Sequence, residues 1–299
     1  MVEPALNRRN LLAAAVLLAG TGPARADGSR LDYEGRMTLA VSVNGSGPLR
    51  FVLDSAASLS LIASDLVEPL GLAPAGVIGM HTLLAREQAT TVIADRVVSG
   101  PLDERGVRMA LGLRSALGGH DGLISPMLLS RRRVTLNFRS QRISVGRTRA
   151  RGESEFSPVR RIRFTSPESP AFGSLVVIPA SVAGRRVAAI LDTGAASTIA
   201  NMALADATGL RMETLADGSR TQAVLSATGR SAPARMAVLP AINLGPVSFD
   251  RVPVLTGDFH AFQVWGFEHT PALLLGTDVL GGLRQLVIDY GTRSVTLDV

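Results

Sequence analysis

Residues 189–195 have the sequence AILDTGA, and residues 51–57 have the related sequence FVLDSAA. In each segment an apolar run ends at an aspartate, which a hydroxyl side chain and two small residues follow. The aspartates lie 138 positions apart, and the two copies align without a gap as far as Leu72 and Leu210. A repeat of this length indicates one structural unit that is present twice. In each copy the stretch after the aspartate motif begins with a polar residue and ends at a glycine, which is typical of a short helix with a glycine C-cap.

A second pair of related segments follows, DGLISPMLL at residues 121–129 and ALLLGTDVL at residues 272–280. Two alternating apolar runs with turn residues between them come after each, at 134–138 and 143–145 and again at 286–290 and 295–297. This alternation predicts a β-hairpin in each copy. Short strands, frequent glycine and proline and few short helices together indicate an all-β chain of two similar halves.

The composition excludes several classes of function. Of the 299 residues, 46% are hydrophobic and 19% are charged, which is typical of a globular chain and not of a disordered one. Cysteine is absent, which excludes disulfides, thiolate zinc sites and a cysteine nucleophile. Lysine is absent too, which excludes Schiff-base chemistry. The net charge of +6 comes from scattered arginines among 25 acidic residues, and aromatic residues are only 4%, so we expect no nucleic-acid partner.

Residues 1–26 have the pattern of an export signal. Arg8 and Arg9 precede an apolar run at 11–19, and Ala24 and Ala26 provide the small residues for cleavage before residue 27. The apolar run is too short to span a bilayer, so we expect no stable membrane anchor. The paired arginines resemble a twin-arginine signal, and an ordinary Sec signal is the alternative. Either route predicts a periplasmic or secreted protein.

The rest of the chain divides into three parts. We expect a first half at 27–147 with a degenerate copy of the motif, a linker at 148–172 and a second half at 173–299. The linker is rich in Arg, Ser, Pro and Glu, and one strand is expected at 162–164.

The repeated motif places a carboxyl group at the end of a buried strand, where ionisation is costly unless hydrogen-bond donors surround it. Pairing the halves about a two-fold axis would bring Asp54 and Asp192 into one site. Two carboxyl groups so near each other cannot both ionise, so one holds a proton and the other does not. Such a pair can activate water and protonate a carbonyl oxygen, which suits peptide hydrolysis without a metal or a covalent intermediate.

The sequence resembles the aspartic peptidases, and the retropepsin-like bacterial members more closely than pepsin. The resemblance covers nearly all of 31–147 and 173–299, and Leu274-Leu275-Gly276 matches the family's apolar-apolar-glycine motif. It implies two small β-barrels related by a pseudo-two-fold axis, with Asp54 and Asp192 as the catalytic residues. The resemblance also implies that the hydroxyl groups of Ser55 and Thr193 form hydrogen bonds across the two halves beneath the carboxyl groups.

The resemblance further implies a β-hairpin flap over each half. The second flap is expected at 221–232 with Thr228 and Gly229 at its tip, where they would contact substrate, and the first at 80–91. The cleft would bind a peptide or protein substrate in extended conformation by strand addition. Neither a cofactor nor a metal is implied.

The first half departs from the family pattern at two positions. It has Ala56 where the second half has Gly194, and Ser125 where the family has a glycine. If position 56 required a positive φ or a close backbone approach, alanine there would cost about 1 kcal/mol. The residues expected to support the two carboxyl groups are those that follow each aspartate, namely Ser55 and Ala56 in the first half and Thr193 and Gly194 in the second.

Three functions follow from these observations. The first is an aspartic endopeptidase that uses both aspartates of one chain. The second is a homodimeric peptidase in which Asp192 faces the same residue of a second copy, so the chain would be either a monomer or a homodimer. The third is a catalytically inactive periplasmic peptide-binding module of the same fold.

Other candidate residues are poorer. The four histidines, His81, His120, His260 and His269, lack metal-ligand spacing, so we expect surface or packing roles and no metal site. The stretch around Trp265 is expected to be a loop at the rim of the substrate site. Asp278 is expected to support the second half, and Met127 stands at the equivalent position of the first.

Overall fold

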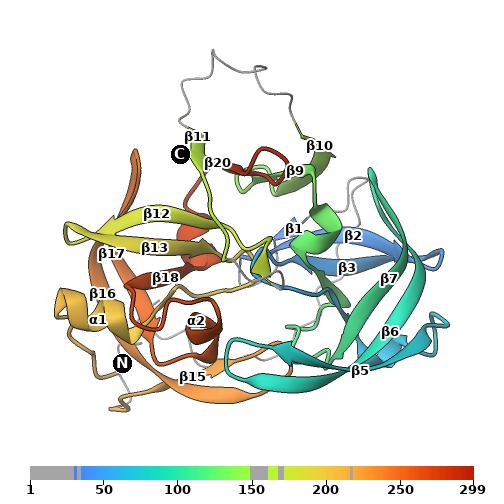
Figure 1. The fold of residues 1–299 in the computed structure, drawn as a ribbon, viewed down its shortest axis with the longest axis horizontal. Helices are drawn as coiled ribbons and strands as arrows, with labels where there is room; N and C mark the ends of the chain where they lie inside the picture. Colours follow the sequence, from blue (N-terminus) through green and yellow to red (C-terminus); the bar gives the residue numbers. More distant parts are fainter. Residues whose placement is uncertain (1–29, 32–34, 149–160, 168–171, 216–217) are drawn as a thin grey trace, which may run out of the picture.

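The computed structural model describes residues 30–31, 35–148, 161–167, 172–215 and 218–299 (Figure 1). The predicted export signal at 1–26 and most of the predicted linker lie outside the described residues. Among the helices that are described, none is long and apolar enough to cross a membrane.

The first half forms a closed β-barrel, on the right of Figure 1. Its sheet has the order β1-β2-β3-β8-β4-β7-β6-β5, and an additional pairing of β2 with β6 closes a ring of six strands. The strands of this sheet are β1 (Arg30–Leu31), β2 (Met37–Val43), β3 (Ser46–Leu53), β4 (Leu61–Ala63), β5 (Ala73–His81), β6 (Arg86–Ser99), β7 (Leu102–Gly112) and β8 (Gly122–Ile124).

The second half repeats this arrangement on the left of Figure 1. Its sheet has the order β12-β13-β18-β14-β17-β16-β15, and β12 also pairs with β16, which closes a second ring of six. These strands are β12 (Val177–Val182), β13 (Arg185–Leu191), β14 (Ile199–Ala200), β15 (Gln222–Leu225), β16 (Ser231–Leu244), β17 (Val247–Thr256) and β18 (Ala272–Leu275). The predicted all-β fold of two similar barrels is therefore confirmed.

A third sheet joins the two barrels. It has the order β10-β9-β19-β20-β11, so a pair of strands from the first half lies beside a pair from the second, and β11 forms the far edge. Its strands are β9 (Arg132–Asn137), β10 (Arg142–Arg147), β11 (Arg161–Arg163), β19 (Gln285–Asp289) and β20 (Ser294–Asp298). Both predicted hairpins and the strand expected at 162–164 are thus present, the strand one residue earlier than expected.

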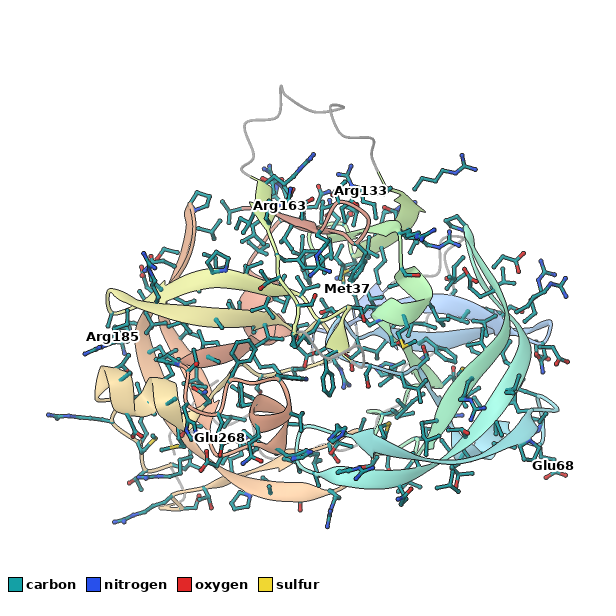
Figure 2. The ribbon with its side chains drawn as sticks, viewed as in Figure 1. Met37, Glu68, Arg133, Arg163, Arg185 and Glu268 are labelled. Atoms are coloured by element: carbon teal, nitrogen blue, oxygen red, sulfur yellow. The ribbon has the colours of Figure 1, made fainter. Side chains whose placement is uncertain are left out.

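Apolar side chains on this sheet connect the cores of the two barrels. Leu136 of β9 lies opposite Leu286 of β19, both are fully buried, and both belong to one core cluster that extends into each barrel. Met37 lies in the same interior, whereas the charged side chains of Glu68 and Arg185 project outward (Figure 2). The halves therefore share a core, which fixes their relative position.

The helices are short, and the two repeats differ in theirs. The second has α1 (Met202–Thr208), which the Asn201 side chain caps by accepting the Leu204 N–H at 2.9 Å. The equivalent position in the first is Ala63, which makes no side-chain cap, and only a 3₁₀ turn, η1 (Ser64–Leu66), forms there. The predicted helix is correct in the second copy and wrong in the first.

Three more helical segments are described, namely η2 (Pro126–Leu129), α2 (His260–Val264) and α3 (Thr277–Leu280). A loop was expected around Trp265, but this stretch also contains the helix α2. Ala261 and Phe262 of α2 are buried and pack in one cluster with Trp265. This burial of apolar side chains is what stabilises so short a helix.

Candidate active site

Each aspartate of the repeat begins the turn that follows a buried strand. β3 and β13 run parallel to β8 and β18, and their last three residues are buried on both faces. The Asp54 N–H donates to the Ile124 carbonyl at 3.1 Å, and the Asp192 N–H donates to the Leu275 carbonyl at 3.0 Å. The sheet hydrogen bonds therefore continue as far as the aspartate, which fixes where its side chain starts.

The two carboxyl groups have matching hydrogen-bond donors. Asp54 Oδ1 accepts the N–H groups of Ala56 and Ala57 at 2.9 and 2.8 Å. In the second half, Asp192 Oδ1 accepts the N–H groups of the equivalent residues, Gly194 and Ala195, at 2.9 and 3.0 Å. These four bonds to the Oδ1 atoms come from backbone groups, so an alanine at position 56 serves as well as a glycine.

Beneath the carboxyl groups, Ser55 and Thr193 connect the two loops. The Ser55 hydroxyl donates to the Leu191 carbonyl at 2.7 Å and accepts the Thr193 N–H at 3.0 Å. The Thr193 hydroxyl donates to the Leu53 carbonyl at 2.6 Å and accepts the Ser55 N–H at 3.1 Å. Both side chains are buried, so these four bonds are shielded from water. They hold the two loops face to face.

Glycine is required at position 194 by a close approach. A Cβ atom there would lie 2.5 Å from Cγ and 2.8 Å from Cβ of Asp54, which no real contact allows. Neither Gly194 nor Ala56 has a positive φ, so the strain considered for Ala56 does not arise from its backbone conformation. The Ala56 side chain instead packs against the apolar cluster around Trp265.

Burial shifts both carboxyl groups in the same direction but to different extents. Burial, and after it the charge of Asp54, raises the pKa of Asp192 well above its ordinary value. Burial also raises the pKa of Asp54, but the N–H groups of Ala56 and Ala57 and the charge of Arg36 oppose this rise. The two groups are within hydrogen-bonding reach of one another and titrate as a pair. Each carboxyl group has two N–H donors, so the charge of Arg36 is what favours the ionised form of Asp54.

A cavity of about 210 Å³ lies over the two carboxyl groups. Both halves line it, and apart from Asp54, Asp192 and His81, Arg36 is the only ionisable residue among the described residues that do so. Its larger apolar lining residues are Val52, Leu59, Leu61, Met80, Leu83, Leu117, Leu123, Phe172, Ile199, Leu225, Val264, Trp265 and Leu274. An apolar cavity with a few converging polar groups is typical of a binding site.

Two hairpins extend over the cavity, where flaps were expected. The first is formed by β5 and β6, with its turn at 82–85, and the second by β15 and β16, with its turn at 226–230. Thr228 and Gly229 lie at the tip of the second hairpin, and Gly229 has a φ of +87°. This tip lies beside Leu113 and Ala116 of the first half, and the cavity is lined by residues 225–227 of the hairpin instead.

The segments that end each copy support the aspartate loops through different side chains. In the second half, the Thr198 hydroxyl accepts the Gly276 N–H at 3.1 Å and donates to Asp278 Oδ1 at 2.7 Å. In the first half, the Ser60 hydroxyl accepts the Ser125 N–H at 3.0 Å and donates to Ser125 Oγ at 3.3 Å. Ser125 therefore supplies the acceptor that Asp278 supplies in the other half.

This substitution explains Met127. With the acceptor provided by Ser125, no carboxylate is needed at the position equivalent to Asp278, and the Met127 side chain is 59% exposed. The presence of Ser125 and that of Met127 in the first half thus belong together.

Comparison with known proteins agrees with this geometry. A profile of the family described as aspartyl protease matches residues 39–128 and 178–279, so each matched region contains one of the two aspartates. The chain belongs to the aspartyl protease family. The resemblance seen in its sequence is therefore confirmed. No curated protein sequence matches the chain.

A solved structure of the same fold is the aspartic proteinase from Irpex lacteus. It is 11% identical in sequence, with 88% of this chain and 94% of that chain covered, and the TM-score is 0.50. At this identity the likeness shows the fold alone. The two-barrel architecture of an aspartyl protease is therefore preserved although most of the side chains differ.

Two features of this aspartyl protease site could not be predicted from the sequence. Arg36 precedes β2 and lines the cavity, and His81 lies 2.8 Å from His260, which is 179 positions away. No local pattern indicates either position. His269 is exposed, His120 is buried, and no group of three potential metal ligands occurs among the described residues.

Proposed function

We propose that the protein is an aspartic endopeptidase in which Asp54 and Asp192 of one chain activate a water molecule between them. The observation that carries the proposal is the set of four hydrogen bonds through Ser55 and Thr193, which places both carboxyl groups of one chain at the floor of one cavity. The family and the fold of the chain agree with it.

The first step of the proposed reaction adds water to the peptide carbonyl. The ionised Asp54 takes a proton from water while the water oxygen bonds to the carbonyl carbon. Asp192 gives its proton to the carbonyl oxygen, so the intermediate is a neutral diol. The N–H donors of Ala56 and Ala57 and the charge of Arg36 favour the ionised form of Asp54, which this step needs.

The second step reverses the two roles. Asp54 now gives its proton to the amide nitrogen, and Asp192 takes a proton from one hydroxyl of the diol. The C–N bond breaks, and the products are a carboxylic acid and an amine. The pair returns to its starting protonation state without a metal or a cofactor in any step.

The substrate would be a peptide or protein in extended conformation. The two hairpins over the cavity offer backbone groups for strand addition, and the apolar walls of the cavity suit apolar side chains. The proposal includes export to the periplasm or the medium, which the pattern of residues 1–26 supports.

The alternatives are less well supported. A dimer that pairs Asp192 with the same residue of a second copy would have to displace Asp54, which already faces Asp192 within the chain. An inactive binding module would be favoured if the first half had lost its carboxyl group or its donors, but both remain.

The purified protein (residues 27–299) and its Asp54→Asn and Asp192→Asn variants would be incubated with a complex peptide mixture from about pH 3 to 7, a range that spans carboxyl titration. Mass spectrometry would identify the products. Loss of cleavage in both variants is the expected result. Loss with Asp192→Asn alone would indicate the dimer, and no cleavage by the unmodified protein would indicate the binding module.

A further inference from the structure

Two histidines from opposite halves meet at the edge of the cavity. His81 is the last residue of β5, in the first-half hairpin, and His260 is the first residue of α2, in the second half. Nδ1 of His81 lies 2.8 Å from Nε2 of His260, and the rings stack with centroids 5.1 Å apart and an interplanar angle of 18°. Both side chains are half-buried.

The turn that follows His81 is docked on the same helix. The Ala261 N–H donates to the Leu83 carbonyl at 3.1 Å. Leu83 and Leu84 pack against the apolar cluster that contains Trp265. We name this turn, residues 82–85, the flap tip.

The flap tip is internally braced. The Thr82 N–H donates to the Ala85 carbonyl at 2.8 Å, and the Thr82 hydroxyl accepts the N–H groups of Leu84 and Ala85. The same hydroxyl lies 3.1 Å from Oε1 of Glu87. Because these bonds are local, the tip is expected to move as a unit.

In this position Thr82 and Leu83 of the flap tip form part of the cavity wall. The hairpin belongs to the first half but is held by the second, so it bridges the two halves over the carboxyl pair. An extended peptide that reaches Asp54 and Asp192 must pass beneath this bridge, and the Leu83 carbonyl, which could accept a hydrogen bond from a peptide, is already occupied. Lifting of the tip would therefore free this carbonyl and widen access to the two carboxyl groups.

The histidine pair makes this bridge sensitive to protons. A hydrogen bond between two imidazole nitrogens needs one donor and one acceptor. It can therefore form when both rings are neutral, and also when only one of them is protonated. When both rings are protonated, two N–H groups and two positive charges face each other. The contact then becomes repulsive.

The surroundings favour the uncharged form of the His81 ring. On β6, the exposed Arg86 lies opposite His81 in the strand register, and Glu87 is engaged by Thr82. Phe172 lies edge-on to His81, Asp258 precedes α2, and Arg36, Asp54 and Asp192 line the same cavity. Burial, the neighbouring His260 and the charge of Arg86 lower the pKa of His81, so the closed tip binds protons less readily than a released one.

We propose that His81 and His260 are positioning residues that hold the flap tip across the cavity, and that protonation of both rings releases the tip and admits substrate. This inference rests on the proposed peptidase function for its purpose, but the latch itself does not depend on catalysis. Release is expected as the pH falls, because the open state takes up the second proton.

Trp265 provides a reporter of the flap tip. It is the only tryptophan in the chain, it is buried, and it belongs to the cluster that Leu83 and Leu84 cover. Its emission would be followed from about pH 8 to 4, which spans histidine titration. Hydrogen exchange of peptides that cover residues 80–92 would be measured over the same range. The expected result is a shift of the emission to longer wavelength in acid, with exchange at least about tenfold faster.

Two variants test the role of the pair. His260→Gln keeps an amide that can accept from or donate to His81 at every pH, so the acid transition should disappear while the tip stays docked. His260→Ala removes the partner, so the tip should be released at every pH. His269→Gln is the matched control, because His269 is 90% exposed and its transition should equal that of the unmodified protein.

The outcomes separate the latch from the reaction. An unchanged acid transition in His260→Gln, or a docked tip in His260→Ala, would overturn the latch. Far-UV circular dichroism would show that each variant is folded. In parallel peptide assays, His260→Gln should raise KM in acid with little change in kcat, because less of the enzyme is open. If Trp265 reports the transition but no peptide is cleaved, the latch stands and the peptidase function fails.

Discussion

The first and second halves hold equivalent carboxyl groups with different residues around them. The second half has Gly194, Gly276 and Asp278, whereas the first has Ala56, Ser125 and Met127 at the equivalent positions. Yet Asp54 and Asp192 each accept two backbone N–H groups at nearly equal distances. The comparison shows that the site needs backbone donors and a buried hydroxyl in both halves, but a glycine beside the carboxyl group in one half only.

The largest effect is expected from exchanging the small residues of the two loops. Gly194→Ala would place a Cβ atom 2.5 Å from Cγ of Asp54 and so push the two carboxyl groups apart. We expect kcat/KM for peptide cleavage to fall by about 100-fold or more, since a shift of about 1 Å has this consequence in other enzymes. Ala56→Gly, which keeps every N–H donor, should leave cleavage near its original rate, and an equal loss in both variants would contradict the asymmetry.

The hydroxyl groups beneath the pair should matter in both halves. Thr193→Val leaves the Leu53 carbonyl and the Ser55 N–H without their hydrogen-bond partner. A buried polar group without a partner lowers the free energy of unfolding by about 1–3 kcal/mol. The free energy of unfolding, measured by denaturant titration, should fall accordingly. Ser55→Thr preserves the hydroxyl and makes the first loop like the second, so it should be tolerated. A stable Thr193→Val variant would show that the cross-bonds are dispensable.

The pH dependence of stability should differ between the two carboxyl groups. The raised pKa of Asp192 means that the folded chain holds this proton more tightly than the unfolded chain does, so the stability it contributes is lost as the pH rises above the ordinary range of aspartate. Asp192→Asn, which stays neutral, should therefore raise Tm by more at neutral pH than in acid. The rise for Asp54→Asn should be smaller, and the reverse order would place the proton on Asp54.

The smallest effect is expected from giving the first half the side chains that support the aspartate loop in the second half. Ser125→Gly removes the acceptor of the Ser60 hydroxyl and should cost about 1 kcal/mol of stability. The double variant Ser125→Gly with Met127→Asp copies the second half, where Asp278 accepts from Thr198, and should recover most of the loss. Thermal denaturation of the single and double variants would measure this. Additive losses of stability would show that the residues at positions 125 and 127 are unrelated.

Much of this structure follows from local sequence. The repeat around Asp54 and Asp192 predicted the paired loops, and the alternation at 134–145 and 286–297 predicted the two hairpins, because apolar periodicity is set by a strand's own faces. The hydroxyls at Ser55 and Thr193 were expected to bond across the halves, and they do.

The failures of prediction have physical causes as well. The helix expected after the first copy is only a 3₁₀ turn, since Ala63 cannot provide the cap that Asn201 provides. α2 was missed because packing around Trp265 stabilises it and its length is below that of a recognisable periodic pattern. Arg36 and the His81–His260 pair depend on contacts between distant segments, which no window of sequence contains.

The third sheet has a consequence for how the chain is made. β9 pairs with β19, so five residue pairs join strands that lie about 150 positions apart. Until β19 has been synthesised, the first half holds β10 on one side of β9 and an open edge on the other. A first half produced without the second would therefore carry an unsatisfied strand edge, and two such fragments would be expected to associate through it.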